Sequence, residues 1–174
     1  MGFLQRGFAY GNRRGFAIPL PELLVEEQIL HNTYGGLYLG GIEWAGQRFW
    51  LPPNRKIATL AFVLCKFGNP PGVITFTIRE YPTNIPLLSK VWGNASDVPS
   101  TYPPVEWQEV EFDTPQLIDT LVEMIVEYSE GDGGNCIAIA SQGGGSVKPD
   151  EEFYRAVEGV DPTSDAAYRY KYYE

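Results

Sequence analysis

The stretch Ile57–Glu80, IATLAFVLCKFGNPPGVITFTIRE, decides the fold class. Apolar and polar residues alternate in its second half, which predicts a strand with a buried row of Ile74, Phe76 and Ile78. The wetter row of the same strand is expected to hold Thr75, Thr77 and Arg79. Between the two apolar runs lies Gly68-Asn69-Pro70-Pro71-Gly72, where proline cannot donate a backbone hydrogen bond and glycine accepts a positive φ. The stretch therefore predicts two strands joined as a hairpin.

Similar short strands are expected elsewhere in the chain, at 37–39, 47–51, 87–92, 105–112, 136–140 and 167–173. Segments 21–30 and 116–128 fit either a helix or a strand, with a period of two favoured at 121–128, and 150–157 is expected to form one or two helical turns. The chain has 19 Gly and 14 Pro, which is typical of many turns and few long helices. These patterns predict an all-β protein, an antiparallel β-sandwich or jelly roll with an extended N-terminal arm.

The domain organisation is expected to be an arm and docking or oligomerisation segment over 1–46, followed by the sandwich over 47–174. Residues 1–21 are basic in an otherwise acidic chain, and their expected partner-docking residues are Phe3, Arg6, Phe8, Tyr10, Arg13, Arg14 and Phe16. A frayed terminus is an equally good interpretation of this segment. An RNA-binding tail is the weakest one, because three arginines do not form a repeat.

Composition excludes several classes of function. The net charge of −9 argues against a nucleic-acid partner. No run approaches the roughly 20 apolar residues that span a bilayer, and no secretory signal is recognised, so no membrane partner is expected. Cys65 and Cys136 are expected to be buried free thiols, with a single bridge as the alternative. No cofactor or metal site is expected. A structural Ca²⁺ is the alternative to a simple turn at Glu130, Asp132 and Asn135.

Three motifs follow one another along the chain: Lys66-Phe67-Gly68-Asn69-Pro70-Pro71-Gly72, then Trp107–Phe112 with Thr114-Pro115, then Ile125–Tyr128 with Gly131–Asn135. In this order they resemble a family of phage, bacterial and archaeal β-sandwich modules that are similar to carbohydrate-binding jelly rolls. The resemblance covers about residues 47–173 and implies a fold more than a ligand. Cys136 departs from the family pattern, where an aromatic residue is usual, and residues 1–46 have no counterpart in it.

The sequence predicts a protein that is not an enzyme. Glycoside hydrolysis needs two converging carboxylates, and the alternating glutamates of 106–127 are typical of a solvated strand face. A glycan surface is expected at Trp92, Asn94, Asp97, Tyr102 and Trp107, although each tryptophan also fits a core position. The expected function is a structural or decoration protein of a phage or virus particle, located in the virion and assembled in the host cytoplasm. Its expected partners are other virion proteins, copies of itself (a trimer) and a host glycan. The alternative is a carbohydrate-binding module of a secreted or cell-surface system.

Overall fold

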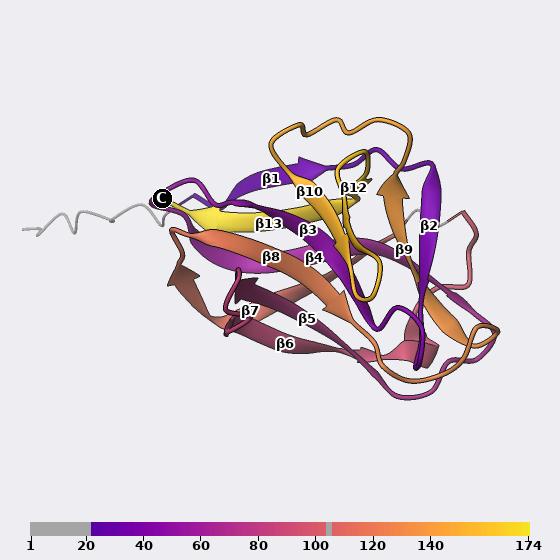
Figure 1. The fold of residues 1–174 in the computed structure, drawn as a ribbon. Coiled ribbons are helices and arrows are strands. Elements are labelled where there is room, and N and C mark those ends of the chain that lie inside the picture. Colours follow the sequence, from indigo (N-terminus) through magenta and orange to yellow (C-terminus); the bar gives the residue numbers. More distant parts are fainter. Residues whose placement is uncertain (1–21, 104–105) are drawn as a thin grey trace, which may run out of the picture.

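The computed structural model describes residues 22–103 and 106–174, which form two antiparallel sheets packed face to face (Figure 1). The predicted class, an antiparallel β-sandwich, is confirmed. A single 3-10 turn, η1 Ala95–Asp97, accompanies the strands in the described ranges. In chain order the strands are β1 Leu24–Gln28, β2 Thr33–Leu37, β3 Trp44–Trp50, β4 Lys56–Phe67, β5 Val73–Glu80, β6 Pro86–Asn94, β7 Trp107–Leu117, β8 Leu121–Glu127, β9 Cys136–Gln142, β10 Glu152–Arg155, β11 Gly159–Asp161, β12 Asp165–Ala166 and β13 Tyr168–Tyr173.

The seven-stranded sheet is built around β4, its longest strand. The strand order is β1-β13-β4-β9-β12, with β2 beside β9 and β7 beside β4. One face of β4 fills the core with Leu60, Phe62 and Leu64. On the other face Val63 belongs to a second buried cluster, against which Tyr34 and Trp107 pack. Because both faces are covered, β4 is apolar along nearly its whole length, as expected of a central strand.

The predicted strands on either side of Gly68–Gly72 are present as β4 and β5, but the expected hairpin is wrong because the two strands do not pair. β5 lies in the six-stranded sheet, whose order is β11-β10-β3-β8-β5-β6. The turn therefore carries the chain from one sheet to the other. Phe62 of β4 meets Phe76 of β5 edge-on across the core, with 5.4 Å between ring centroids. Gly68 and Gly72 both have positive φ, as the turn chemistry predicts.

Strand pairing and side-chain burial in the structure show which of four local predictions are right. The helical turns expected at 150–157 are wrong, because this segment contains β10, which pairs with β3. The segment 21–30 takes its strand alternative, over β1. Thr77 is buried rather than wet, and its hydroxyl lies 3.0 Å from that of Ser89 on β6. Cys65 and Cys136 are free and buried, as predicted.

The sandwich begins earlier than the predicted boundary at residue 47. β1 pairs with β13, where Leu24 lies opposite Tyr172, and β2 pairs with β9, where Leu37 lies opposite Ile137. Residues 24–46 therefore supply β1, β2 and the start of β3 to the two sheets. The glycine pair Gly35-Gly36, which favours a loop by composition, lies inside β2.

Candidate functional site

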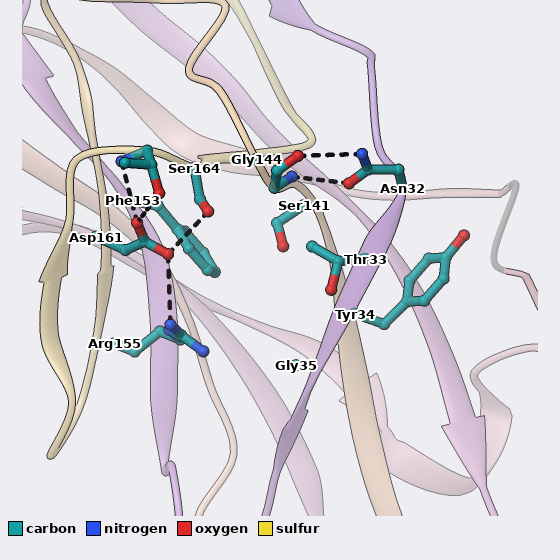
Figure 2. Close-up of a pocket in the computed structure, with 12 residues that line it drawn as sticks. Asn32, Thr33, Tyr34, Gly35, Ser141, Gly144, Phe153, Arg155, Asp161 and Ser164 are labelled. Atoms are coloured by element: carbon teal, nitrogen blue, oxygen red, sulfur yellow. Dashed lines mark hydrogen bonds and ion pairs between the residues drawn. The ribbon is translucent and has the colours of Figure 1, made fainter.

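A polar cleft opens between the two sheets at one edge of the sandwich (Figure 2). Strands β2 and β9 of the seven-stranded sheet form one wall, and β10, β11 and the loop after β11 form the other. Its volume is about 450 Å³. The lining is mostly hydroxyl, amide and charged groups, with the ring of Phe153 from β10 as its aromatic part, whereas the Tyr34 ring points away from the cleft on the other face of β2 (Figure 2).

The wall on the β2 side is fixed by a reciprocal pair of hydrogen bonds. The Asn32 side chain accepts from Gly143 N at 2.8 Å and donates to Gly143 O at 3.1 Å. Next to this pair the hydroxyls of Thr33 and Ser141 face the cleft (Figure 2). Ser141 is 2% exposed, and neither hydroxyl has a hydrogen-bond partner among the described residues. Both hydroxyls are therefore free to bond a ligand that enters the cleft.

The opposite wall is organised by Asp161. Its carboxylate accepts hydrogen bonds from the Thr163 hydroxyl at 2.8 Å, the Ser164 hydroxyl at 2.8 Å and Thr163 N at 3.0 Å. The Thr163 hydroxyl is the largest cause that lowers the pKa of Asp161, and so Asp161 is ionised at neutral pH. Arg155 pairs with Asp161 at 3.6 Å and with Glu158 at 2.6 Å, while its Nε is buried without a hydrogen-bond partner in the described ranges.

These groups suit a neutral molecule that carries many hydroxyls. Thr33 and Ser141 offer donors and acceptors. The positive charge of Arg155 is already shared by two carboxylates, so an anion gains little from it. Asp161 holds no proton to give at neutral pH, which makes it a poor general acid.

The structure does not bring the five sequence-predicted glycan residues together. Trp92 packs against the main core, and Asn94 donates to Asp97 at 3.0 Å beside η1. Trp107 packs on the second buried cluster, under the guanidinium of Arg169.

Tyr102 contacts Tyr34 of β2, on the face of that strand that points away from the cleft. It is 58% exposed, and its ring centroid lies 5.1 Å from that of Tyr34. The arm residues predicted to dock, Phe3, Arg6, Phe8, Tyr10, Arg13, Arg14 and Phe16, lie outside the described residues. The turn at Glu130–Asn135 is present, with the Asp132 carboxylate accepting from Gly134 N at 2.7 Å.

Sequence reasoning missed the residues that line the cleft. Asn32 and Gly143 are 111 residues apart, so no local pattern links them. The one available signal was Asp161-Pro162-Thr163-Ser164, in which an aspartate precedes hydroxyl residues that can bond it, as in an Asx turn. That signal predicts a turn and says nothing of a ligand.

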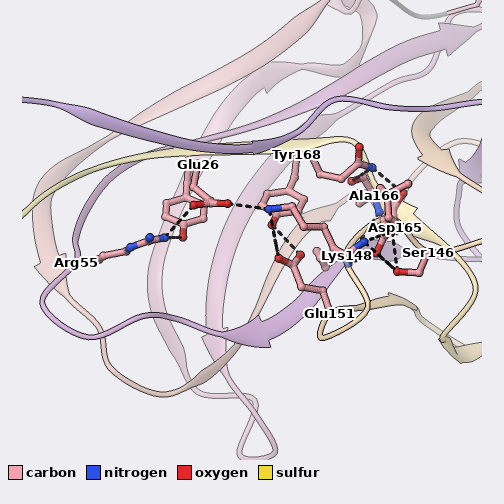
Figure 3. Close-up of polar contacts among 12 residues, drawn as sticks. Glu26, Arg55, Ser146, Lys148, Glu151, Asp165, Ala166 and Tyr168 are labelled. Atoms are coloured by element: carbon pink, nitrogen blue, oxygen red, sulfur yellow. Dashed lines mark hydrogen bonds and ion pairs between the residues drawn. The ribbon is translucent and has the colours of Figure 1, made fainter.

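A buried polar network holds the segment 143–151 that joins the two walls (Figure 3). Asp165, which is fully buried, accepts from Val147 N at 2.6 Å, from Lys148 N at 3.2 Å and from the Gln47 amide at 2.9 Å. Lys148 in turn donates to Glu26 of β1 at 2.7 Å. Because Gly143 and Gly144 line the cleft at one end of this segment and Phe153 follows its other end, the network also fixes the cleft.

Glu151 gives this network a pH dependence. Burial, with the side chain 13% exposed, raises its pKa to about 7, although the Tyr168 hydroxyl donates to it at 2.7 Å. A carboxyl whose folded pKa lies above its unfolded value stabilises the fold at low pH, and this contribution is lost as the pH rises toward about 7.

We expect Glu151→Gln to raise the free energy of unfolding by about 2 kcal/mol at pH 8, with no gain at pH 4. Gln keeps an acceptor for Tyr168 and carries no charge to bury. Urea unfolding of both chains at the two pH values measures the difference. An equal gain at both values would show that the ionisation of Glu151 is not the cause.

Comparison of the sequence with models of protein families and with curated proteins finds no match. Within 22–103 and 106–174, no group of three or more His, Cys, Asp and Glu side chains is placed to hold a metal ion. In the same part of the chain, no helix has the length and apolar character needed to cross a bilayer.

Proposed function

We propose that this protein is a non-enzymatic β-sandwich that binds a neutral oligosaccharide in the cleft between its sheets. The observation that carries the proposal is the pair of unpartnered hydroxyls, Thr33 and Ser141, directed into a polar cleft of about 450 Å³. A sugar ring supplies hydroxyls that complete these hydrogen bonds. The ring of Phe153 supplies apolar area for the C–H face of a sugar.

Hydrogen bonding favours a ligand of this class over an apolar one. The Ser141 residue is buried, and an apolar group placed against it would leave the hydroxyl without any partner, at a cost of about 1–3 kcal/mol. A hydroxylated ligand removes that cost. The carboxylates of Asp161 and Glu158 repel an anionic sugar, so a neutral glycan is the better match.

We further propose that the sandwich is a structural or decoration component of a phage or virus particle. Support comes from the charge distribution: three arginines and no acids precede Glu22, whereas all 22 acidic residues lie from Glu22 onward. A basic aromatic segment next to an acidic domain is suited to docking on a like copy or another particle protein. Neighbouring genes for capsid or tail proteins would support this placement, and genes for glycan-active enzymes would favour a free carbohydrate-binding module.

A glycan array of neutral and anionic oligosaccharides, followed by calorimetry on the hits, tests the binding proposal. We expect a neutral glycan to bind the full chain, and Thr33→Val with Ser141→Ala to weaken binding about tenfold. Thr114→Val is the matched control, because Thr114 is an exposed strand threonine on β7, outside the cleft. The proposal fails if no neutral glycan binds, or if the control weakens binding as much as the cleft variant.

A further inference from the structure

A second recess lies on the solvent-facing side of the six-stranded sheet. It has a volume of about 450 Å³ and is lined by Arg48, Tyr81, Leu121, Pro149, Asp150 and Glu152. Trp50 stands beside it, two residues after Arg48 on β3 and opposite Leu121 on β8. Trp50 is 68% exposed, so its ring is open to contact with a partner.

The floor of the recess already binds a guanidinium. The Arg48 side chain lies between the rings of Tyr81 and Tyr154, at 3.7 and 4.1 Å from their centroids. Glu123 binds the same guanidinium at 2.6 Å. This arrangement shows what the surface favours, namely a flat cation stacked on aromatic rings and paired with a carboxylate.

The rim of the recess carries two carboxylates, Asp150 and Glu152. Asp150 is exposed and has no ion pair within the described ranges, and Glu152 is 44% exposed, with Arg48 at 3.3 Å. Beneath the recess Glu123 is shared by Arg48 and Arg79. Glu152 therefore also pairs with Arg48, and Asp150 is the carboxylate left over. The recess therefore presents excess negative charge beside the exposed ring of Trp50.

We infer that this recess binds residues 1–21 of the chain. That segment carries Arg6, Arg13 and Arg14, interleaved with four aromatic residues, and contains no acid. The other 153 residues hold ten Lys and Arg against 22 Asp and Glu, so the two parts are complementary in charge. An arginine of the segment stacks on Trp50 and pairs with Asp150 and Glu152, while its aromatic side chains contact Leu121 and Tyr81.

The path of the chain brings the two together. Residues 1–21 lead into β1, and Glu26 of β1 binds Lys148, which directly precedes Pro149 of the recess. Up to about 70 Å of extended chain is available from 21 residues, which reaches the recess of the same copy or of a neighbour. This inference deepens the proposed place in an assembly, and it is independent of the glycan cleft.

The test uses a labelled peptide of residues 1–21 and a chain that starts at Glu22, since every strand of the described residues lies from Leu24 onward. Fluorescence anisotropy is expected to show saturable binding. Binding should weaken about tenfold with Trp50→Ala or with Asp150→Asn plus Glu152→Gln. A peptide with Arg13→Glu and Arg14→Glu should not bind. The control, Glu111→Gln plus Asp113→Asn, removes the same charge from exposed positions of β7 and should change binding less than twofold.

Absence of binding, or equal weakening by the recess and control variants, would overturn the inference. The second result would mean that overall charge, rather than the recess, attracts the peptide. Glycan binding by the recess variants should stay unchanged, so failure here is separable from failure of the cleft proposal. Light scattering on the full chain then identifies the source of the bound segment. If the segment comes from a neighbouring copy, the measured mass exceeds that of one chain. Either source agrees with the inference.

Discussion

Replacing Glu123 with alanine is expected to lower the free energy of unfolding by about 3–5 kcal/mol. Glu123 is 1% exposed and joins two arginines, with 2.6 Å from Oε1 to Arg48 Nη2 and 2.6 Å from Oε2 to Arg79 Nε. Both guanidinium groups are held against aromatic rings, Arg79 on Trp44 and Arg48 between two tyrosines. Without the carboxylate, two largely buried cations lose their counter-ion and repel each other.

Urea denaturation at pH 7 measures the loss, and Glu152→Ala is the matched control. Glu152 pairs with the same Arg48 at 3.3 Å but is 44% exposed, so its removal should cost no more than about 1 kcal/mol. Equal losses for the two variants would mean that burial of Glu123 adds nothing to its pairing. Such a result would also weaken the view that the sheet face prefers a paired, stacked guanidinium.

Substituting Gly46 with alanine is expected to destabilise the fold by about 3 kcal/mol or more. A Cβ at Gly46 would lie 1.9 Å from Met124 O and 2.7 Å from the Cα of Ile125, in the paired strand β8. Both contacts are backbone atoms, so a rotamer change cannot relieve them. β3 and β8 would have to separate, and the hydrogen bonds between them at the centre of the six-stranded sheet would be lost.

Gly93→Ala is the control, since Gly93 lies in edge strand β6 and a Cβ there meets no atom within 4 Å. We expect it to change the stability by less than about 0.5 kcal/mol. Thermal unfolding of the three chains by circular dichroism provides the comparison. A Gly46→Ala chain as stable as Gly93→Ala would show that β3 and β8 can move apart at little cost.

The sequence locates the strands well and their partners poorly. Alternation marks β5 and β13, because one face of each meets the core, and in β13 the alternating Tyr168, Tyr170 and Tyr172 are all buried. Which strands pair is a long-range property. Gly68–Gly72 contains all the signals of a tight connection, yet the strands on its two sides do not pair. β4 pairs with β13, β7 and β9, and β5 pairs with β6 and β8. Local turn chemistry is the same for a hairpin and for a crossing between sheets.

The candidate site was harder to predict than the fold. An aromatic residue such as Trp92 looks the same in sequence whether it packs in the core or faces solvent, and here it packs against the core. Trp50, which is the exposed tryptophan, sits in an ordinary strand pattern. The cleft depends on Ser141 and Asp161 lining one space from two sheets, and the turn signal at Asp161 predicts no ligand.

The pairing of β1 with β13 places the first and the last described strands side by side in one sheet. Leu24 lies opposite Tyr172, so the chain enters and leaves the described fold side by side at one end (Figure 1). The cleft is lined by residues that follow the far end of β1, beginning at Asn32. A tether joined before Leu24 or after Tyr173 is therefore attached at the end of the sandwich where these two residues lie. The end that carries the cleft stays free to bind a ligand. An immobilised chain should consequently bind with the same affinity whichever of its two ends is attached to the support.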